Sequence, residues 1–204
     1  ETVEADDRPV VSLPVTDNAA LAVVDDEGRL TSLVVVTLSP SGQGGTIVTV
    51  PVTADANSGA SEPRVALSSL LDPEDPAEFF ARVEGTLAIT LQFGEIVGAD
   101  RLGQLLEPTL PADIDIPLEV RDSEETADGL VVVAGEVRLG LPLLAPVLQA
   151  VDVDATERQQ HAIDVAVWSG VAASAPVVAD RASVPIDDQG RPLSAVDIDE
   201  LFAR

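Results

Sequence analysis

The sequence predicts an α/β domain of three layers, in which a central mixed β-sheet is flanked by helices on both faces. In the stretch 30–53, two apolar runs rich in Val, Ile and Thr enclose a Ser-Pro-Ser-Gly-Gln-Gly-Gly segment, which is typical of a hairpin. Nearly continuous apolarity in 32–38 indicates a strand buried on both faces. Strand-like and helix-like segments then alternate, which favours a sheet covered by helices. In such a layer the loop after a strand's carboxyl end usually holds the site, and here that loop begins at Val52 and Thr53.

Length and composition limit the function classes. The 204 residues fit one domain, and because 46% are hydrophobic but only 2% aromatic, the core has to be aliphatic. The 36 acidic residues against 11 basic ones give a net charge of -25, which repels nucleic-acid phosphates and anionic lipid headgroups. The absence of cysteine excludes disulfides and thiolate chemistry. No apolar run approaches the roughly 18 residues that a membrane-spanning helix requires.

Residues 1–8 form a polar lead-in, and residues 9–204 are expected to form a single domain. Such a lead-in is typical of a segment after a removed anchor or signal, although an arbitrary chain boundary looks the same. Strands are expected at 9–13, 20–24, 92–97, 114–120, 130–133, 137–139 and 184–186. Helical segments are expected at 64–71, from Asp75 onward, and at 100–106, 141–150, 154–173 and 194–202. The helix that begins at Asp75 should bury a stripe of Phe79, Phe80, Val83 and Leu87, and the helix at 141–150 should be interrupted at Pro146. Asp154 with Glu157, and Ser194 with Asp197, are expected to cap the helices at 154–173 and 194–202, and Gln159 to lie at the margin of the core.

The order of these elements and several local sequence segments resemble the LytR-CpsA-Psr (LCP) family of extracytoplasmic cell-wall ligases. The resemblance covers about residues 29–168 and rests on LVVVTLSP, TIVTVPVT, RVALSSL, PAEFFARVEGTLAITLQFGEIVGADRLGQLLEPTLPADIDIPLEV and ATERQQHAIDVAV. It implies an LCP-like fold and a phosphotransfer that moves a glycopolymer from a polyprenyl-pyrophosphate carrier to peptidoglycan. In that family, arginines clamp the pyrophosphate and acidic residues hold a divalent metal.

Departures from the family's motifs fall on the residues that carry this chemistry. The family's Ile-Pro-Arg-Asp stands here as Val50-Pro51-Val52-Thr53, and its aspartate at the start of the preceding strand corresponds to Thr31. The paired arginines correspond to Gln149 and Val151, and Lys-Ile-Asn to Arg64-Val65-Ala66, whereas Arg158-Gln159-Gln160 is intact. The candidate residues of this degenerate pocket are Val52, Thr53, Arg64, Gln149, Arg158 and Gln159.

The resemblance and these losses together favour a catalytically silent relative, because removing one such donor commonly costs about 10²- to 10³-fold in rate. We expect a non-catalytic extracytoplasmic domain of the cell envelope, which binds a polyprenyl-linked lipid or another envelope protein. We expect no catalytic residue, cofactor, metal or nucleic-acid partner, and membrane contact only through an anchor outside this chain. Two alternatives stay open. One is an active phosphotransferase that uses Glu62, Arg64 and Arg158, and the other is a secreted acidic domain with only a fold-level likeness.

Other polar patterns have structural explanations. The Asp-x-Asp repeats at 113–115, 152–154 and 197–199 are expected to be solvated charges, since none has the glycine and spaced oxygens of a calcium loop. His161 and Asp164 lie one helical turn apart, but no Gly-x-Ser-x-Gly elbow accompanies them, so a structural histidine is expected. Trp168 is expected to be a packing residue.

Leucines of the expected helices are predicted to face inward. They are Leu102, Leu105, Leu106, Leu143, Leu144 and Leu148. With so few aromatic residues, they would form either a close-packed core or the lining of an apolar tunnel that opens near Val52 and Arg158.

Overall fold

The computed structural model describes residues 16–41, 44–57, 62–123, 129–175, 186–188 and 192–204. The expected strand 9–13, the lead-in 1–8 and residues 184–185 lie outside these ranges. The central sheet consists of β1 (Asn18–Val24), β2 (Leu30–Leu38), β3 (Gly45–Val50) and β4 (Phe93–Val97). The helices are α1 (Ala77–Leu87), α2 (Ala99–Leu106), α3 (Leu141–Gln149), α4 (Glu157–Ser174) and α5 (Ile198–Ala203), with 3₁₀ turns η1 (Leu67–Ser69) and η2 (Glu107–Thr109).

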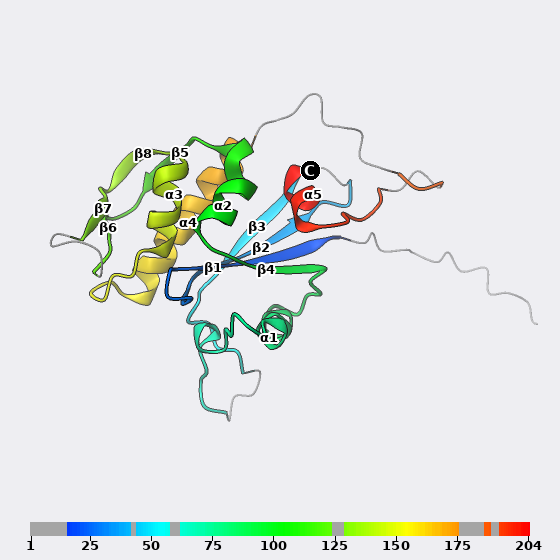
Figure 1. Cartoon of the computed structure of the whole chain (residues 1–204), viewed down its shortest axis with the longest axis horizontal. Helices are drawn as coiled ribbons and strands as arrows, with labels where there is room; N and C mark the ends of the chain where they lie inside the picture. The colour runs from blue at the N-terminus through cyan, green and yellow to red at the C-terminus, as the bar shows by residue number, and fades with distance from the viewer. Residues whose placement is uncertain (1–15, 42–43, 58–61, 124–128, 176–185, 189–191) are drawn as a thin grey trace, which may run out of the picture.

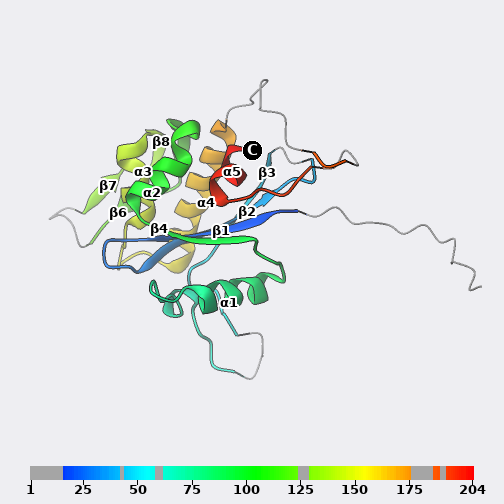
Figure 2. The same ribbon diagram turned by 45° about the vertical axis from the view of Figure 1, so that its right-hand side comes forward.

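Three layers are visible in Figure 1, where α1 lies on one side of the central sheet and the other helices lie on the opposite side. Figure 2 shows the same separation after a turn of the view. The strand order is β3-β2-β1-β4. Strand β1 pairs antiparallel with β2 and parallel with β4, and β2 pairs antiparallel with β3, so the sheet is mixed. The predicted fold class and the predicted hairpin are both confirmed.

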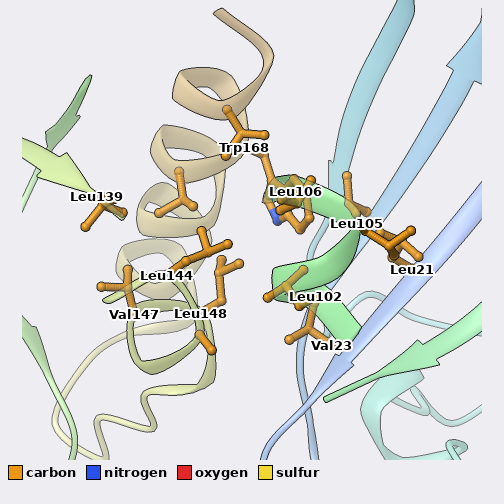
Figure 3. Packing of buried hydrophobic residues seen from close by; sticks show 14 of the residues in the cluster. Leu21, Val23, Leu102, Leu105, Leu106, Leu139, Leu144, Val147, Leu148 and Trp168 are labelled. Atoms are coloured by element: carbon orange, nitrogen blue, oxygen red, sulfur yellow. The ribbon is translucent and has the colours of Figure 1, made fainter. Parts of the chain in front are cut away.

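Each face of the sheet has its own apolar core. On the α1 side, Phe79 and Val83 are fully buried, and Phe80 and Leu87 pack partly buried beside them, as the sequence pattern predicts. The larger cluster lies on the other side (Figure 3) and contains Trp168, which is 1% exposed and therefore a packing residue. Five of the six leucines expected to face inward belong to this cluster: Leu102, Leu105, Leu106, Leu144 and Leu148. Leu143 is 38% exposed, so the prediction is wrong for that residue.

The expected strand 114–120 is wrong, because the chain breaks at Pro117 into two strands of separate ribbons. Strand β5 (Ala112–Ile116) pairs with β8 (Gly135–Leu139), and β6 (Val120–Arg121) pairs with β7 (Leu130–Val132). Proline has no N–H to donate to a ladder, which explains the break. The strand predicted at 130–133 is buried only in part, since Leu130 and Val133 are 43% and 56% exposed because these ribbons lie outside the central sheet.

Two helix starts differ from the predicted ones. Helix α4 is capped by Thr156, whose Oγ1 accepts from Gln159 N at 3.3 Å while Gln159 Oε1 accepts from Thr156 N at 2.9 Å. A Thr-x-x-Gln box therefore replaces the expected box at Asp154, and Gln159 is exposed, not at the core margin. Helix α5 begins after Asp197, whose Oδ1 accepts from Glu200 N at 2.8 Å, and not after Ser194.

Two further helix predictions are corrected. Helix α3 continues through Pro146, although a proline there cannot donate a backbone hydrogen bond to the carbonyl four residues earlier. The expected turn 64–71 is reduced to η1, and the expected strand near residue 186 is an isolated bridge between Ile186 and Pro192. None of the described helices is both long and apolar enough to cross a bilayer.

Candidate functional site

A cleft of about 530 Å³ lies at one edge of the central sheet, where β1 and β3 end and β2 begins. We call it the carboxyl-edge cleft. Figure 1 shows the β1–β2 turn, in blue, approaching the yellow connection between α3 and α4 at this edge. Its described lining residues are Gly28, Arg29, Leu30, Thr31, Val52, Ser68, Ser69, Leu71, Ala150, Val151, Asp152, Ala155, Glu157 and Gln160.

The β1–β2 turn supplies the one cation among these lining residues. Gly28 has φ +78°, a conformation that favours glycine, and its N–H donates to the Asp25 carbonyl at 3.0 Å. Arg29 then folds back on the turn, with Nε 2.6 Å from Asp25 Oδ2 and Nη2 3.2 Å from Glu27 Oε2. The Arg29 charge is therefore engaged by two carboxylates of its own turn.

Two lining residues, Thr31 and Val52, are those that the sequence resemblance aligns with an acid and a clamp arginine. Thr31 is 7% exposed, and its Oγ1 donates to the Val23 carbonyl at 3.3 Å. Val52 contributes an apolar side chain, while its carbonyl accepts from Ser68 N at 2.8 Å and so fixes the loop to η1. Both positions present neutral groups to the cleft.

The α3–α4 connection forms another wall, to which Val151, Asp152 and Gln160 contribute. Gln160 Nε2 donates to the Ala150 carbonyl at 3.4 Å. Gln149 is not a lining residue, because its Nε2 donates to the Val24 carbonyl at 2.6 Å and ties α3 to the end of β1.

Arg64 and Thr53 are brought together beside this wall. Arg64 Nη2 donates to the Thr53 carbonyl at 2.6 Å and lies 3.6 Å from Glu157 Oε2. The Arg64–Glu157 pair is exposed, so its contribution to stability is at most about 1 kcal/mol. Beside this pair, hydrogen bonds from the backbone N–H groups of Asn57 and Val65 lower the pKa of Asp55.

Arg158 and Gln159 lie on the first turn of α4, outside the lining. Arg158 is exposed, and its side chain makes no hydrogen bond or ion pair within the described residues. Several lining residues were not predicted from the sequence, namely Ser68, Ser69, Asp152 and Gln160. The intact Arg-Gln-Gln motif could have indicated Gln160, which lies one helical turn after the lining residue Glu157.

A buried polar network lies in the core between α4 and β2. Trp168 Nε1 donates to Ser32 Oγ at 3.1 Å, and both side chains are almost completely buried. Asp164 is 3% exposed, and its burial raises its pKa to about 8, although a hydrogen bond to Ser32 acts in the opposite direction. Asp164 Oδ1 and His161 Nδ1 are buried without a hydrogen-bond partner among the described residues. Because Ser32 is inaccessible and bonded to Asp164, this set is not a nucleophilic triad.

The carboxyl-edge cleft offers hydroxyl, amide and carboxylate groups, and its one described cation is already paired. Among the described residues, no group of three or more His, Asp or Glu side chains is arranged to hold a metal ion. Such a lining suits hydrogen bonding to neutral or cationic groups better than neutralising a pyrophosphate.

We expect Mg²⁺ to leave the melting temperature unchanged, because Thr31 and Thr53 supply no carboxylate and the described acidic residues form no group of three that is arranged to hold a metal ion. The measurement is a thermal unfolding curve with micromolar Mg²⁺ against a control of matched ionic strength. A rise in melting temperature that occurs only with Mg²⁺ would contradict this prediction.

No family model and no curated protein matches the sequence, whereas solved structures do. A protein from Eubacterium siraeum described as a transcription regulator matches over 84% of this chain and 67% of its own, with 10% identity and a TM-score of 0.59. The LytR-Csp2A-Psr enzyme from Actinomyces oris matches over 78% and 60%, with 17% identity and a TM-score of 0.56. TagT bound to LIIa-WTA matches over 76% and 62%, with 11% identity and a TM-score of 0.55.

These matches define the class of fold. The chain has an LCP-like fold, as the sequence resemblance implied. It spans 60% to 67% of the length of these three solved chains.

Proposed function

We propose that this chain is a degenerate, non-catalytic LCP-like domain that acts outside the cytoplasmic membrane in cell-envelope biogenesis. It binds a polyprenyl-linked lipid or another envelope protein and does not transfer a glycopolymer. The LCP-like fold supports the cell-envelope role, and the TagT structure with LIIa-WTA gives an example of a ligand held by a protein of this fold.

The observation that carries the non-catalytic assignment is the lining of the carboxyl-edge cleft. Phosphoryl transfer depends on cations that neutralise charge developing on the phosphate oxygens. Thr31 and Val52 supply none, and Arg29 is held by Asp25 and Glu27. A pyrophosphate in this cleft would also meet the carboxylates of Asp152 and Glu157, which oppose its binding.

An active phosphotransferase is the second candidate, and one observation favours it. Arg158 is exposed and unpaired among the described residues, and it neighbours the lining residue Glu157. In this alternative, Arg158 and Arg64 would turn toward the cleft and replace the missing clamp.

We expect the purified chain to show no glycopolymer transfer and no pyrophosphate hydrolysis with a polyprenyl-pyrophosphate-linked glycan, because the cleft has no unpaired cation among its described lining residues. Turnover is measured as released phosphate and as glycan attached to peptidoglycan. Turnover that Arg158→Ala abolishes, but Arg82→Ala on α1 preserves, would establish the alternative.

A gain-of-function variant makes this negative result informative. Val52→Arg places a guanidinium at the family's clamp position, so it should strengthen pyrophosphate binding by roughly tenfold or more. Val48→Arg, on an exposed position of β3, is the matched control and should leave binding unchanged. Equal effects of the two variants would show that the cleft is not the binding site. Binding of a fluorescent polyprenyl phosphate to the unmodified chain then separates a lipid-binding role from a protein-binding role.

A further inference from the structure

The outer face of α3 is apolar although it faces solvent. Helix α3 contains no charged residue, and Leu144, Ala145, Val147 and Leu148 form its buried side. Its other side exposes Leu141 and Leu143, at 43% and 38%, together with Pro142 and Pro146. A helix that is apolar all round is normally covered on both sides, so this face lacks a cover in the described chain.

A groove of about 600 Å³ runs between this face and α2. Its α3 wall is formed by Leu141, Pro142 and Pro146. Gly103 of α2 also lines it without a side chain, since a Cβ there would lie 3.4 Å from Leu141 Cδ2. The groove is therefore apolar on the α3 side, and on the α2 side no side chain projects into it at Gly103.

The opposite wall is acidic. Asp100 and Glu107 are exposed lining residues, and within the described chain neither carboxylate makes a hydrogen bond or an ion pair. They lie about two helical turns apart, roughly 10 Å along the axis, with Gln104 between them. The adjacent Arg101 does not neutralise them, because it is bound to Glu95 at 2.6 Å and to Asp199 at 2.8 Å.

Charge selects the class of occupant. An anionic lipid surface would be repelled by the acidic wall, and a second copy of a chain with a net charge of -25 would be repelled as a whole. A segment with an apolar face and cations about two turns apart satisfies both walls at once.

We propose that the groove between α2 and α3 binds a basic amphipathic helix of a partner polypeptide, with apolar side chains against Leu141 and Pro146 and two cations against Asp100 and Glu107. This surface is separate from the carboxyl-edge cleft, and none of the cleft's lining residues takes part in it. The two proposals can therefore fail independently.

The test uses a fluorescein-labelled synthetic helix of Leu and Ala with two arginines seven positions apart. Fluorescence anisotropy should show saturable binding that weakens with salt, and no binding of a matched helix with glutamates in place of the arginines. Asp100→Lys with Glu107→Lys should weaken binding roughly tenfold or more, and Leu141→Asp should do the same. The charge-matched control, Asp26→Lys with Asp75→Lys at exposed turn positions, should change it little.

Several results would overturn the proposal. Equal weakening by the groove pair and the control pair would show that the attraction is only to net charge. If the peptide does not bind, the face has no such partner. Tighter binding to phosphatidylglycerol vesicles than to the peptide would assign the face to a lipid surface. Self-association that Leu141→Asp abolishes would assign it to a second copy of the chain. Circular dichroism and melting curves confirm that each variant is folded.

Discussion

The free energy of unfolding should fall as the pH rises from about 4 to about 8, and Asp164→Asn should remove most of this dependence. Burial raises the pKa of Asp164 from its model-compound value of 3.8 to about 8 in the folded chain. The folded state therefore holds a proton that the unfolded state releases within this window. The stabilisation from this bound proton is fully present below pH 3.8 and is lost as the pH rises through 8, on the order of 6 kcal/mol in total.

The Asp164→Asn variant separates the contribution of Asp164 to the pH dependence of stability from that of the overall net charge. A net charge of -25 also changes stability with pH, so the informative quantity is the difference between the two slopes. Asp115→Asn, at an exposed position of β5, is the matched control and should keep the original slope. Urea unfolding can be followed through Trp168, the only tryptophan, whose indole N–H donates to Ser32 beside Asp164. His161 is the titratable neighbour one turn away, and the slope should persist in His161→Gln. Identical slopes for the unmodified chain and Asp164→Asn would contradict the prediction.

Local patterns were sufficient to predict the elements that depend on short-range chemistry. The hairpin of β2 and β3 follows from two β-branched runs around a Pro/Gly turn, and this signal lies within one short stretch. The buried stripe of α1 is equally local, because Phe79 and Val83 lie one turn apart on the same helical face.

Where two neighbouring residues could each end or begin an element, tertiary contacts decide which one does. Asp154 and Thr156 are both acceptable helix caps, and the local sequence does not decide which one α4 uses. The same holds for 114–120, where apolar alternation continues across Pro117 although the two halves join different ribbons. Burial of Asp164 could not be predicted either, because it results from the way α4 packs and not from its own polar spacing.

The candidate site was predictable only where sequence motifs name its residues. Thr31 and Val52 were located through the resemblance, and both line the cleft. Ser68 and Asp152 come from segments far apart in the sequence, and only the fold brings them to one edge. The approach of Arg64 to Glu157 likewise spans a long stretch of chain that no local pattern connects.

Gly170→Ala should destabilise the chain, although alanine is the better helix former. A Cβ on Gly170 would lie 2.4 Å from Ile114 Cγ1, so either the Ile114 side chain or the packing of α4 on β5 would have to shift. Relief of such overpacking costs about 1–3 kcal/mol, against a propensity gain of about 1 kcal/mol. We expect a net loss of up to about 2 kcal/mol in the free energy of unfolding, measured by urea denaturation.

Gly85→Ala is the matched control, because a Cβ on this glycine of α1 would meet nothing within 4 Å. That variant should gain about 0.5–1 kcal/mol from propensity alone. A double-mutant cycle with Ile114→Ala tests the stated cause, since removing the Ile114 side chain beyond Cβ should reduce or reverse the cost of Gly170→Ala. If Gly170→Ala instead stabilises the chain as Gly85→Ala does, then α4 does not pack against β5 as closely as described.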